Sequence, residues 1–199
     1  MRKEETLRRV YRHPLLTEEQ FQTISEAHKE ITFNKGDLFL SKGEISNSFL
    51  ILENGLMRSF LFNYEGNEIT TNFYSDFEVV IDVLSLFKRT PSDGYIQALT
   101  DCNCWEIELE RFEQYYQSMQ AMSEWGRAWM SEQLFESKHR AVEMITENAT
   151  SRYLKLIREK PLVIRQAPLK QIASYLGVTD TSLSRIRKEL SKGSYLASN

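Results

Sequence analysis

The chain has 199 residues, a net charge of −3 and 41% hydrophobic residues, a composition typical of a globular protein with one large or two modest domains. No apolar run approaches the length of a membrane span, and the opening MRKEETLRRVYRHP has no apolar signal core, so we expect a cytoplasmic protein without a membrane partner. Two cysteines, Cys102 and Cys104, are too few for a disulfide framework or a four-thiolate metal site.

The charge is unevenly distributed along the chain. From residue 151 onward there are ten basic and three acidic residues, a net of +7, whereas residues 1–150 carry a net of −10. Because neutralisation of phosphates supplies most of the non-specific affinity for DNA, this asymmetry favours the last quarter of the chain as a nucleic-acid face. A basic but merely solvated helical surface is the alternative.

The first 110 residues predict one helix followed by a β-rich body. A helix is expected over residues 17–29, with Thr17 as N-cap and Gln20 at the capping-box position. Glycines then separate short apolar runs, a spacing typical of an antiparallel sandwich or barrel. The strands expected are 38–40, 49–52, 56–62, 69–73, 96–99 and 104–109, with a turn at 65–67 and a short helix over 79–87.

Residues 110–145 predict a short helix followed by a long one, because they contain no proline and their apolar residues recur at three- and four-residue steps. Met122, Trp125 and Trp129 form a stripe too apolar to face water, and we expect them to lie in a dimer interface. Packing within one chain is the alternative. Asn148 or Thr150 should begin the next helix, which Pro161 should end after Lys160.

Residues 169–190, LKQIASYLGVTDTSLSRIRKEL, have the spacing of a helix-turn-helix. Gly177 suits the turn because it tolerates a positive φ, and Thr179 is a candidate N-cap for the second helix. The apolar residues expected between the two helices are Ile172, Ala173, Leu176, Val178, Leu183 and Ile186. An ordinary helical hairpin with a glycine corner is the alternative.

The second helix of this pair carries side chains that can reach base edges or phosphates in a major groove. The residues expected to contact DNA are Thr179, Asp180, Thr181, Ser182, Ser184, Arg185, Arg187 and Lys188.

Three segments resemble the cyclic-AMP receptor protein/Fnr family of bacterial transcription regulators: KGDLFLSKGE (35–44), LILENGLMRSF (50–60) and IASYLGVTDTSLSRIRKEL (172–190). The resemblance implies an α+β fold: an N-terminal jelly-roll barrel of the cyclic-nucleotide-binding type (a double-stranded β-helix), a long dimerisation helix and a C-terminal helix-turn-helix domain. The expected boundaries are 1–118, 119–147 and 148–199. Only nine residues follow Leu190, so the wing that usually follows the recognition helix is expected to be short or absent.

Carried over by position, Arg185 corresponds to the base-contacting arginine of the family, while Asp180 and Thr181 replace the arginine and glutamate of the cyclic-AMP receptor. In the effector domain, Ser92 and Asp93 of TPSDGYIQAL replace the Arg-Ser pair that holds the cyclic phosphate.

Two other residues complete the effector site that the resemblance implies. Arg89 is the nearest arginine, and Glu78 is a loose match for the glutamate that binds the ribose. An aspartate beside a phosphate repels it, so we expect an effector domain that does not respond to cyclic AMP. No cofactor is identified, and an unknown small-molecule effector is a candidate.

The function expected is a dimeric transcription regulator that reads a palindromic operator, with double-stranded DNA, a second copy of the chain and RNA polymerase as candidate partners. An effector-binding signalling module whose C-terminal helices bind a protein is the alternative. A cupin-like metal enzyme would need clustered histidines, and His13, His28 and His139 lie outside the predicted strands. No catalytic or metal-binding set is expected.

Overall fold

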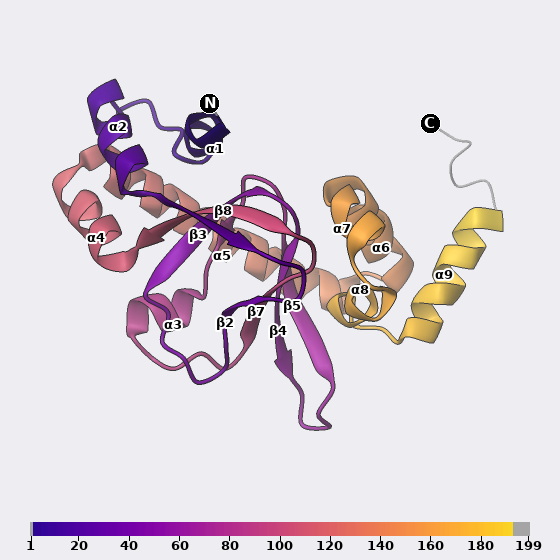
Figure 1. The fold of residues 1–199 in the computed structure, drawn as a ribbon. Helices are drawn as coiled ribbons and strands as arrows, with labels where there is room; N and C mark the ends of the chain where they lie inside the picture. The colour runs from indigo at the N-terminus through magenta and orange to yellow at the C-terminus, as the bar shows by residue number, and fades with distance from the viewer. Residues whose placement is uncertain (1, 193–199) are drawn as a thin grey trace.

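The structure, a computed structural model, describes residues 2–192, and the expected short or missing wing lies outside that part of the chain (Figure 1). The strands are β1 (Lys29–Phe33), β2 (Leu38–Leu40), β3 (Ser48–Asn54), β4 (Met57–Phe62), β5 (Glu68–Tyr74), β6 (Val79–Val80), β7 (Tyr95–Ala98) and β8 (Cys102–Glu108). The helices are α1 (Arg2–Val10), α2 (Glu18–Ala27), α3 (Val83–Lys88), α4 (Leu109–Ser118), α5 (Gln120–Thr146), α6 (Ala149–Glu159), α7 (Pro161–Gln166), α8 (Leu169–Tyr175) and α9 (Asp180–Lys192).

The strands form two four-stranded antiparallel sheets with the orders β1-β8-β3-β6 and β2-β7-β4-β5. Strands that are distant in sequence are neighbours in both sheets, as in a jelly roll. The six predicted strands are confirmed with ends within two residues of those observed. Cys102 and Cys104 both lie buried on β8 and pack in the same apolar cluster, together with Leu50, Met57 and Ile96.

A second apolar cluster joins the N-terminal helices to the barrel. Phe21 of α2 and Phe49 of β3 belong to it, together with residues of α4 and the first half of α5. The predicted capping box of α2 is confirmed, because the Gln20 amide donates to the Thr17 hydroxyl at 3.2 Å. The predicted end at residue 29 is wrong, since residues 29–33 pair with β8 as strand β1. Helix α1 was not predicted.

The segment before β7 differs from its prediction as a helix over residues 79–87. Val79 and Val80 pair with Ile51 and Leu50 of β3, so they form a strand instead of the first helical turn. Helix α3 begins only at Val83, where the Asp82 side chain accepts a hydrogen bond from the Ser85 amide at 3.0 Å. The partner strand, which lies far away in sequence, decides the conformation here.

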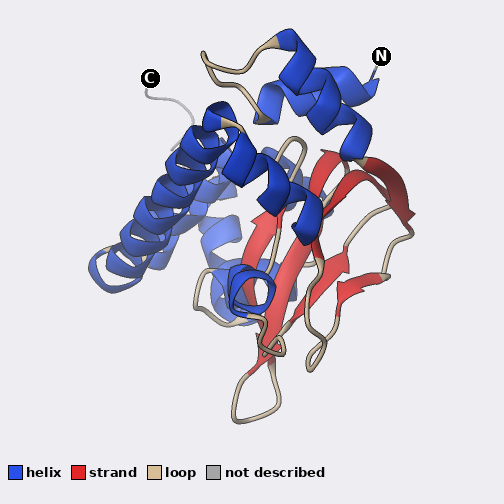
Figure 2. Cartoon of the chain, turned by 90° about the vertical axis from the view of Figure 1, so that its left-hand side faces the viewer, coloured by secondary structure: helices blue, strands red, loops and turns tan. Residues whose placement is uncertain are grey.

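Helix α5 runs past the barrel and connects it to the C-terminal helices. Figure 1 shows α1, α2 and α4 at one end of the molecule and α6–α9 at the other, and Figure 2 shows the helices gathered beside and above the strands. Asn148 caps α6 as predicted, and Pro161 both follows this helix and begins α7, which was not predicted. No helix in residues 2–192 is long and apolar enough to cross a membrane.

Candidate functional site

Helices α8 and α9 form a compact pair at the basic end of the chain. Gly177 adopts a φ of +68° at the turn between them, and the Thr179 hydroxyl accepts a hydrogen bond from the Ser182 amide at 3.2 Å, so both predicted roles are confirmed. Ile172, Ala173 and Leu183 are at most 2% exposed and form the contact between the helices. The predicted apolar residues therefore do pack the pair.

The polar face of α9 is open to solvent. All eight residues expected to contact DNA are exposed: Thr179, Asp180, Thr181, Ser182, Ser184, Arg185, Arg187 and Lys188. The Arg185 Nε donates to Glu189 Oε1 at 2.9 Å, with side chains that are 81% and 61% exposed. Because such an exposed ion pair adds little free energy, on the order of 0.5 kcal/mol, Arg185 is available to another acceptor.

The turn between α8 and α9 also rests on the long helix. A Cβ added to Gly177 would lie 2.5 Å from the Met144 Cε, the flexible end of that side chain, so Met144 of α5 lies directly against the turn. Nearby, the Arg140 guanidinium lies over the Tyr175 ring at 3.7 Å and donates to the Tyr175 carbonyl at 3.1 Å. Burial lowers the pKa of Arg140. The long helix therefore fixes the position of the pair.

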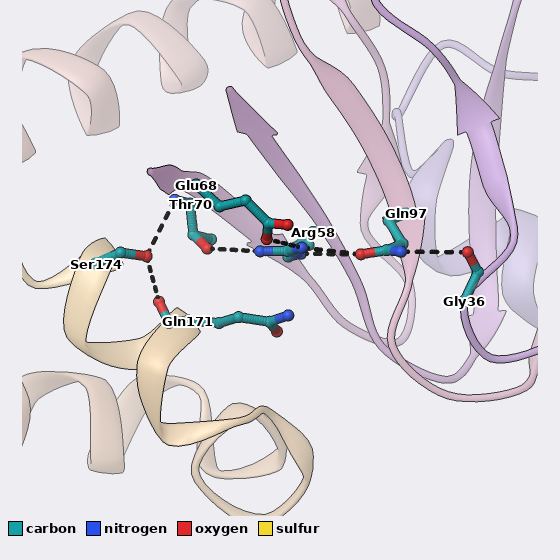
Figure 3. Close-up of polar contacts among 7 residues, drawn as sticks. All are labelled: Gly36, Arg58, Glu68, Thr70, Gln97, Gln171 and Ser174. Carbon is teal, nitrogen blue, oxygen red and sulfur yellow. Dashed lines mark hydrogen bonds and ion pairs between the residues drawn. The ribbon is translucent and has the colours of Figure 1, made fainter. Parts of the chain in front are cut away.

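A polar junction connects α8 to strand β5. The Thr70 amide donates to the Ser174 hydroxyl at 3.1 Å, and this hydroxyl donates to the Gln171 carbonyl at 3.0 Å (Figure 3). Beside it, the Phe73 and Tyr175 rings lie 5.1 Å apart. Strand β5 and helix α8 are thus held by both a hydrogen bond and an aromatic contact.

Arg58 lies under this junction. Its side chain is 3% exposed, and its guanidinium donates to Glu68 Oε2 at 2.6 Å and to the Gln97 Oε1 at 2.9 Å (Figure 3). Burial lowers the pKa of Arg58, while the hydrogen bond to Glu68 opposes that shift. The Gln171 side chain extends toward this group, but its buried Oε1 has no hydrogen-bond partner among the described residues (Figure 3).

A cavity of about 340 Å³ lies in the barrel between strands β4 and β5, helix α3 and the segment before β7. Ser92 and Asp93, two of the four residues predicted for the effector site, line it. Asp82 also lines it but was not predicted as a site residue. Its position three residues before Ser85 is the spacing of an N-cap and could have indicated it. The Ser92 hydroxyl donates to Asp82 Oδ2 at 2.6 Å.

Glu78 and Arg89, which were also predicted for the effector site, do not line this cavity. Glu78 Oε1 instead accepts from the Lys160 ammonium at 2.8 Å, which ties the barrel to the end of α6. Arg89 has a φ of 56° and donates to the Ser46 carbonyl at 2.5 Å, so its side chain is directed toward the loop before β3. Neither residue adjoins Ser92 in the cavity.

The described lining of the barrel cavity contains two carboxylates, Asp82 and Asp93, and neither lysine nor arginine. Its other polar groups are mostly hydroxyls: Ser59, Thr71, Tyr74, Ser85, Thr90, Ser92 and Tyr95. A cavity of this composition offers hydrogen bonds to a neutral or cationic ligand, and no cation to a phosphate.

The predicted dimer stripe lies largely inside the single chain. Met122 and Trp125 are 1% and 8% exposed, because they pack on the barrel and on the N-terminal helices. The Trp125 indole donates to the Val10 carbonyl at 2.7 Å, and Trp129 stacks on Trp125 at 6.4 Å. Met122 and Trp125, which were predicted to contact a second copy, are therefore covered within the single chain, and Trp129 is partly buried in the same cluster.

A different face of α5 is exposed. Its apolar side chains that are at least 39% exposed are Met130, Leu134, Phe135, Val142, Met144 and Ile145. Leu134 and Ile145 are eleven residues apart, which is close to three helical turns, so they lie on one side of the helix. The long helix thus has two apolar faces, of which one is covered within the chain.

Residues 30–119 match the family described as cyclic nucleotide-binding domain. Among characterised proteins, the cGMP-dependent protein kinase of Plasmodium berghei is 22% identical to this chain over 165 residues. That alignment covers 83% of this chain but only 19% of the kinase. The chain therefore spans about a fifth of that relative, and the similarity concerns its nucleotide-binding part.

Solved structures match most of the chain. FixK2 from Bradyrhizobium japonicum matches with a TM-score of 0.72 at 16% identity, covering 83% of this chain and 85% of FixK2. A transcriptional regulator of the Crp/Fnr family from Eubacterium rectale matches with a TM-score of 0.68 at 18% identity, covering 90% and 87%. The catabolite activator protein of Thermus thermophilus matches with a TM-score of 0.57 at 16% identity, covering 89% and 84%. The predicted jelly roll followed by a long helix is confirmed.

Proposed function

Because residues 30–119 match the cyclic nucleotide-binding domain family and the chain shares its fold with the cyclic-AMP receptor protein/Fnr regulators, we propose that this protein is a dimeric, DNA-binding transcription regulator of that type. The domains proposed are an effector barrel at 1–118, a dimerisation helix at 119–147 and a helix-turn-helix domain at 148–199. We place its action in the cytoplasm, with RNA polymerase as a further candidate partner and no catalytic role.

One observation carries this proposal: helix α9 is anchored on α8 by buried apolar residues while its opposite side is fully exposed and basic. Arg185, Arg187 and Lys188 stand on that exposed side. A helix held in this way by a glycine turn and an N-cap has the form of a recognition helix, which enters the major groove with its polar face. The net charge of +7 after residue 150 supports attraction to the phosphate backbone.

Dimerisation supplies the second recognition helix that a palindromic operator requires. We propose the exposed face of α5, with Leu134 and Ile145 at its centre, as the two-fold interface. When the α5 helices of two copies pair, they bury these side chains against each other. The two copies of α9 should then lie ~34 Å apart, one turn of DNA, so that they enter successive major grooves.

The effector of the barrel is proposed to be other than cyclic AMP. The cavity that holds Asp82, Ser92 and Asp93 has no cation for a cyclic phosphate among its described residues. A neutral or cationic small molecule fits the carboxylates and hydroxyls that line it.

The test is selection of binding sites from a random pool of double-stranded DNA by the full-length protein. The proposal predicts enrichment of an inverted repeat whose half-sites lie one helical turn apart. If no sequence is enriched and the protein binds DNA only weakly and independently of salt, sequence-specific DNA binding is rejected. That result would favour the alternative in which the C-terminal helices bind a protein. The matched control is a variant with Arg185, Arg187 and Lys188 all changed to glutamine, which should lose the enrichment while keeping its thermal stability.

A further inference from the structure

A second cavity lies outside the barrel, where the barrel meets helices α4 and α5. Its volume is about 330 Å³, and residues of β3, β6, α3, α4 and α5 line it. It is distinct from the proposed effector cavity, although Ile81 lines both and forms a wall between them.

Six of its twelve lining residues are aromatic. Trp125 and Trp129 of α5 stack with an angle of 19° between their planes, and Phe49 and Phe112 meet edge to face at 5.2 Å. Gly126 sets the shape of one end, because a Cβ there would lie only 2.7 Å from the Tyr116 ring. Flat rings on several sides favour a flat ligand that can stack between them.

The charge of the lining restricts the ligand further. Glu113 is its only carboxylate, and the described lining contains no lysine, arginine, histidine or cysteine. An anion would therefore find no counter-charge, and a soft metal ion would find a single sulfur ligand, the Met130 thioether, among the described lining residues. A mainly apolar, uncharged molecule is the class that these walls accept.

The size of the opening favours a small molecule over a protein. Phe49, Val79 and Phe112 are buried deep in the cavity, whereas Phe87 and Met130 at the opening are 41% and 42% exposed. A stable protein interface buries on the order of 1,000 Å² or more and involves about 20–30 residues on each side, whereas twelve residues line this cavity. We propose that this cavity binds an uncharged, flat aromatic molecule of two to three rings, independently of DNA binding.

The experiment uses the neutral dye N-phenyl-1-naphthylamine, whose emission rises in apolar surroundings and which accepts energy from excited tryptophan. We expect saturable binding to the full-length protein, with a matching loss of tryptophan emission because Trp125 and Trp129 line the cavity. Met130→Arg places a charge at the opening and should weaken binding about tenfold or more. Glu132→Arg, two residues further along α5, exposed and outside the cavity, should leave the affinity within about twofold of wild type.

Three results would overturn the proposal. The first is the absence of saturable dye binding by a wild-type protein with a normal melting curve. The second is loss of binding in Leu84→Arg, since Leu84 is 60% exposed and lines the barrel cavity instead. The third is loss of binding in Leu134→Arg, which would mean that a second copy of the chain forms the site. The test needs no DNA, so its failure leaves the proposed function untouched.

Discussion

The backbone amide of Thr70 in β5 donates a hydrogen bond to the hydroxyl of Ser174 in α8 across 104 residues of sequence. Thr70 is 1% exposed, so this amide has no access to water when the bond is lost. The barrel and the C-terminal helices therefore share a buried polar contact, next to the apolar one formed by Phe73 and Tyr175. The orientation of α8, and with it of α9, depends on this contact.

Ser174→Ala should lower the free energy of unfolding by about 1–3 kcal/mol, because a buried amide donor then has no partner. The measurement is urea denaturation followed by circular dichroism. Ser118→Ala is the matched control: Ser118 also donates to a carbonyl of its own helix, but it is exposed and accepts nothing from another element. Equal stability of the two variants would show that the junction contributes nothing measurable.

The sequence predicted those elements whose signals are local. Glycines between short apolar runs located the strands, and Thr17 with Gln20, and Thr179 with Gly177, located helix ends, because caps and positive φ angles are determined by a few neighbouring residues. The two-residue strand β6 could not be predicted, since its conformation depends on pairing with β3.

The face of α5 that contacts the barrel could not be predicted from the sequence either. Periodicity showed that Trp125 and Trp129 belong to an apolar stripe, but Leu134 and Ile145 form another one. Only the three-dimensional packing shows which stripe the barrel covers. The N-cap role of Asp82 could have been predicted from its three-residue spacing to Ser85. The pairing of Glu78 with Lys160 could not, because no sequence pattern links these two residues.

His28 should make the protein less stable in mild acid. Its ring is 2% exposed, its Nδ1 lies 2.8 Å from the Ile24 carbonyl, and its Nε2 lies 3.2 Å from the Tyr11 hydroxyl. Burial lowers the pKa of His28 from 6.5 to about 4. The unfolded chain therefore binds a proton at His28 more tightly than the folded chain does. The contribution of the neutral His28 ring to the free energy of unfolding is complete above pH 6.5 and is lost as the pH falls from 6.5 to about 4.

Protonation of His28 should lower the free energy of unfolding by about 3 kcal/mol at most, since each unit of pKa difference corresponds to about 1.4 kcal/mol. Unfolding by urea at a series of pH values between 4 and 7 measures it. His28→Gln should flatten the dependence of the unfolding free energy on pH in this range, while His13→Gln, at a half-buried position, should not. An identical slope in wild type and His28→Gln would exclude His28 as the titrating group.

Arg185→Ala should cost about 1–3 kcal/mol of discrimination between the selected operator and random DNA, because the arginine contacts a base edge in the proposed function. Lys188→Ala should instead weaken binding to all sequences alike and reduce its salt dependence. Fluorescence anisotropy at several fixed salt concentrations measures both. Unchanged operator affinity in Arg185→Ala would refute its assignment as a base reader.

Leu134→Glu should convert a dimer into a monomer, since it places a charge in the proposed two-fold interface where Leu134 is 65% exposed in the single chain. Sedimentation at micromolar concentration measures the change. Glu132→Gln is the control, because two residues correspond to about 200° around the helix and place it on another side. A wild-type protein that sediments as a monomer would contradict the interface and, with it, the palindromic operator.

Cyclic AMP should not stabilise this protein. Binding a cyclic phosphate inside the barrel requires a nearby cation, because an unpaired anion removed from water costs several kcal/mol. The described lining of the barrel cavity offers Asp82, Ser92 and Asp93 in place of a cation. Arg89 donates to the Ser46 carbonyl and does not line the cavity. A ligand at a hundred times its Kd adds roughly 2.7 kcal/mol of stability, so a melting curve at millimolar nucleotide detects any affinity of about 10 μM or tighter. We expect no shift of Tm with cyclic AMP or cyclic GMP, and a micromolar Kd by calorimetry would show that the cavity recruits a cation that the described lining lacks.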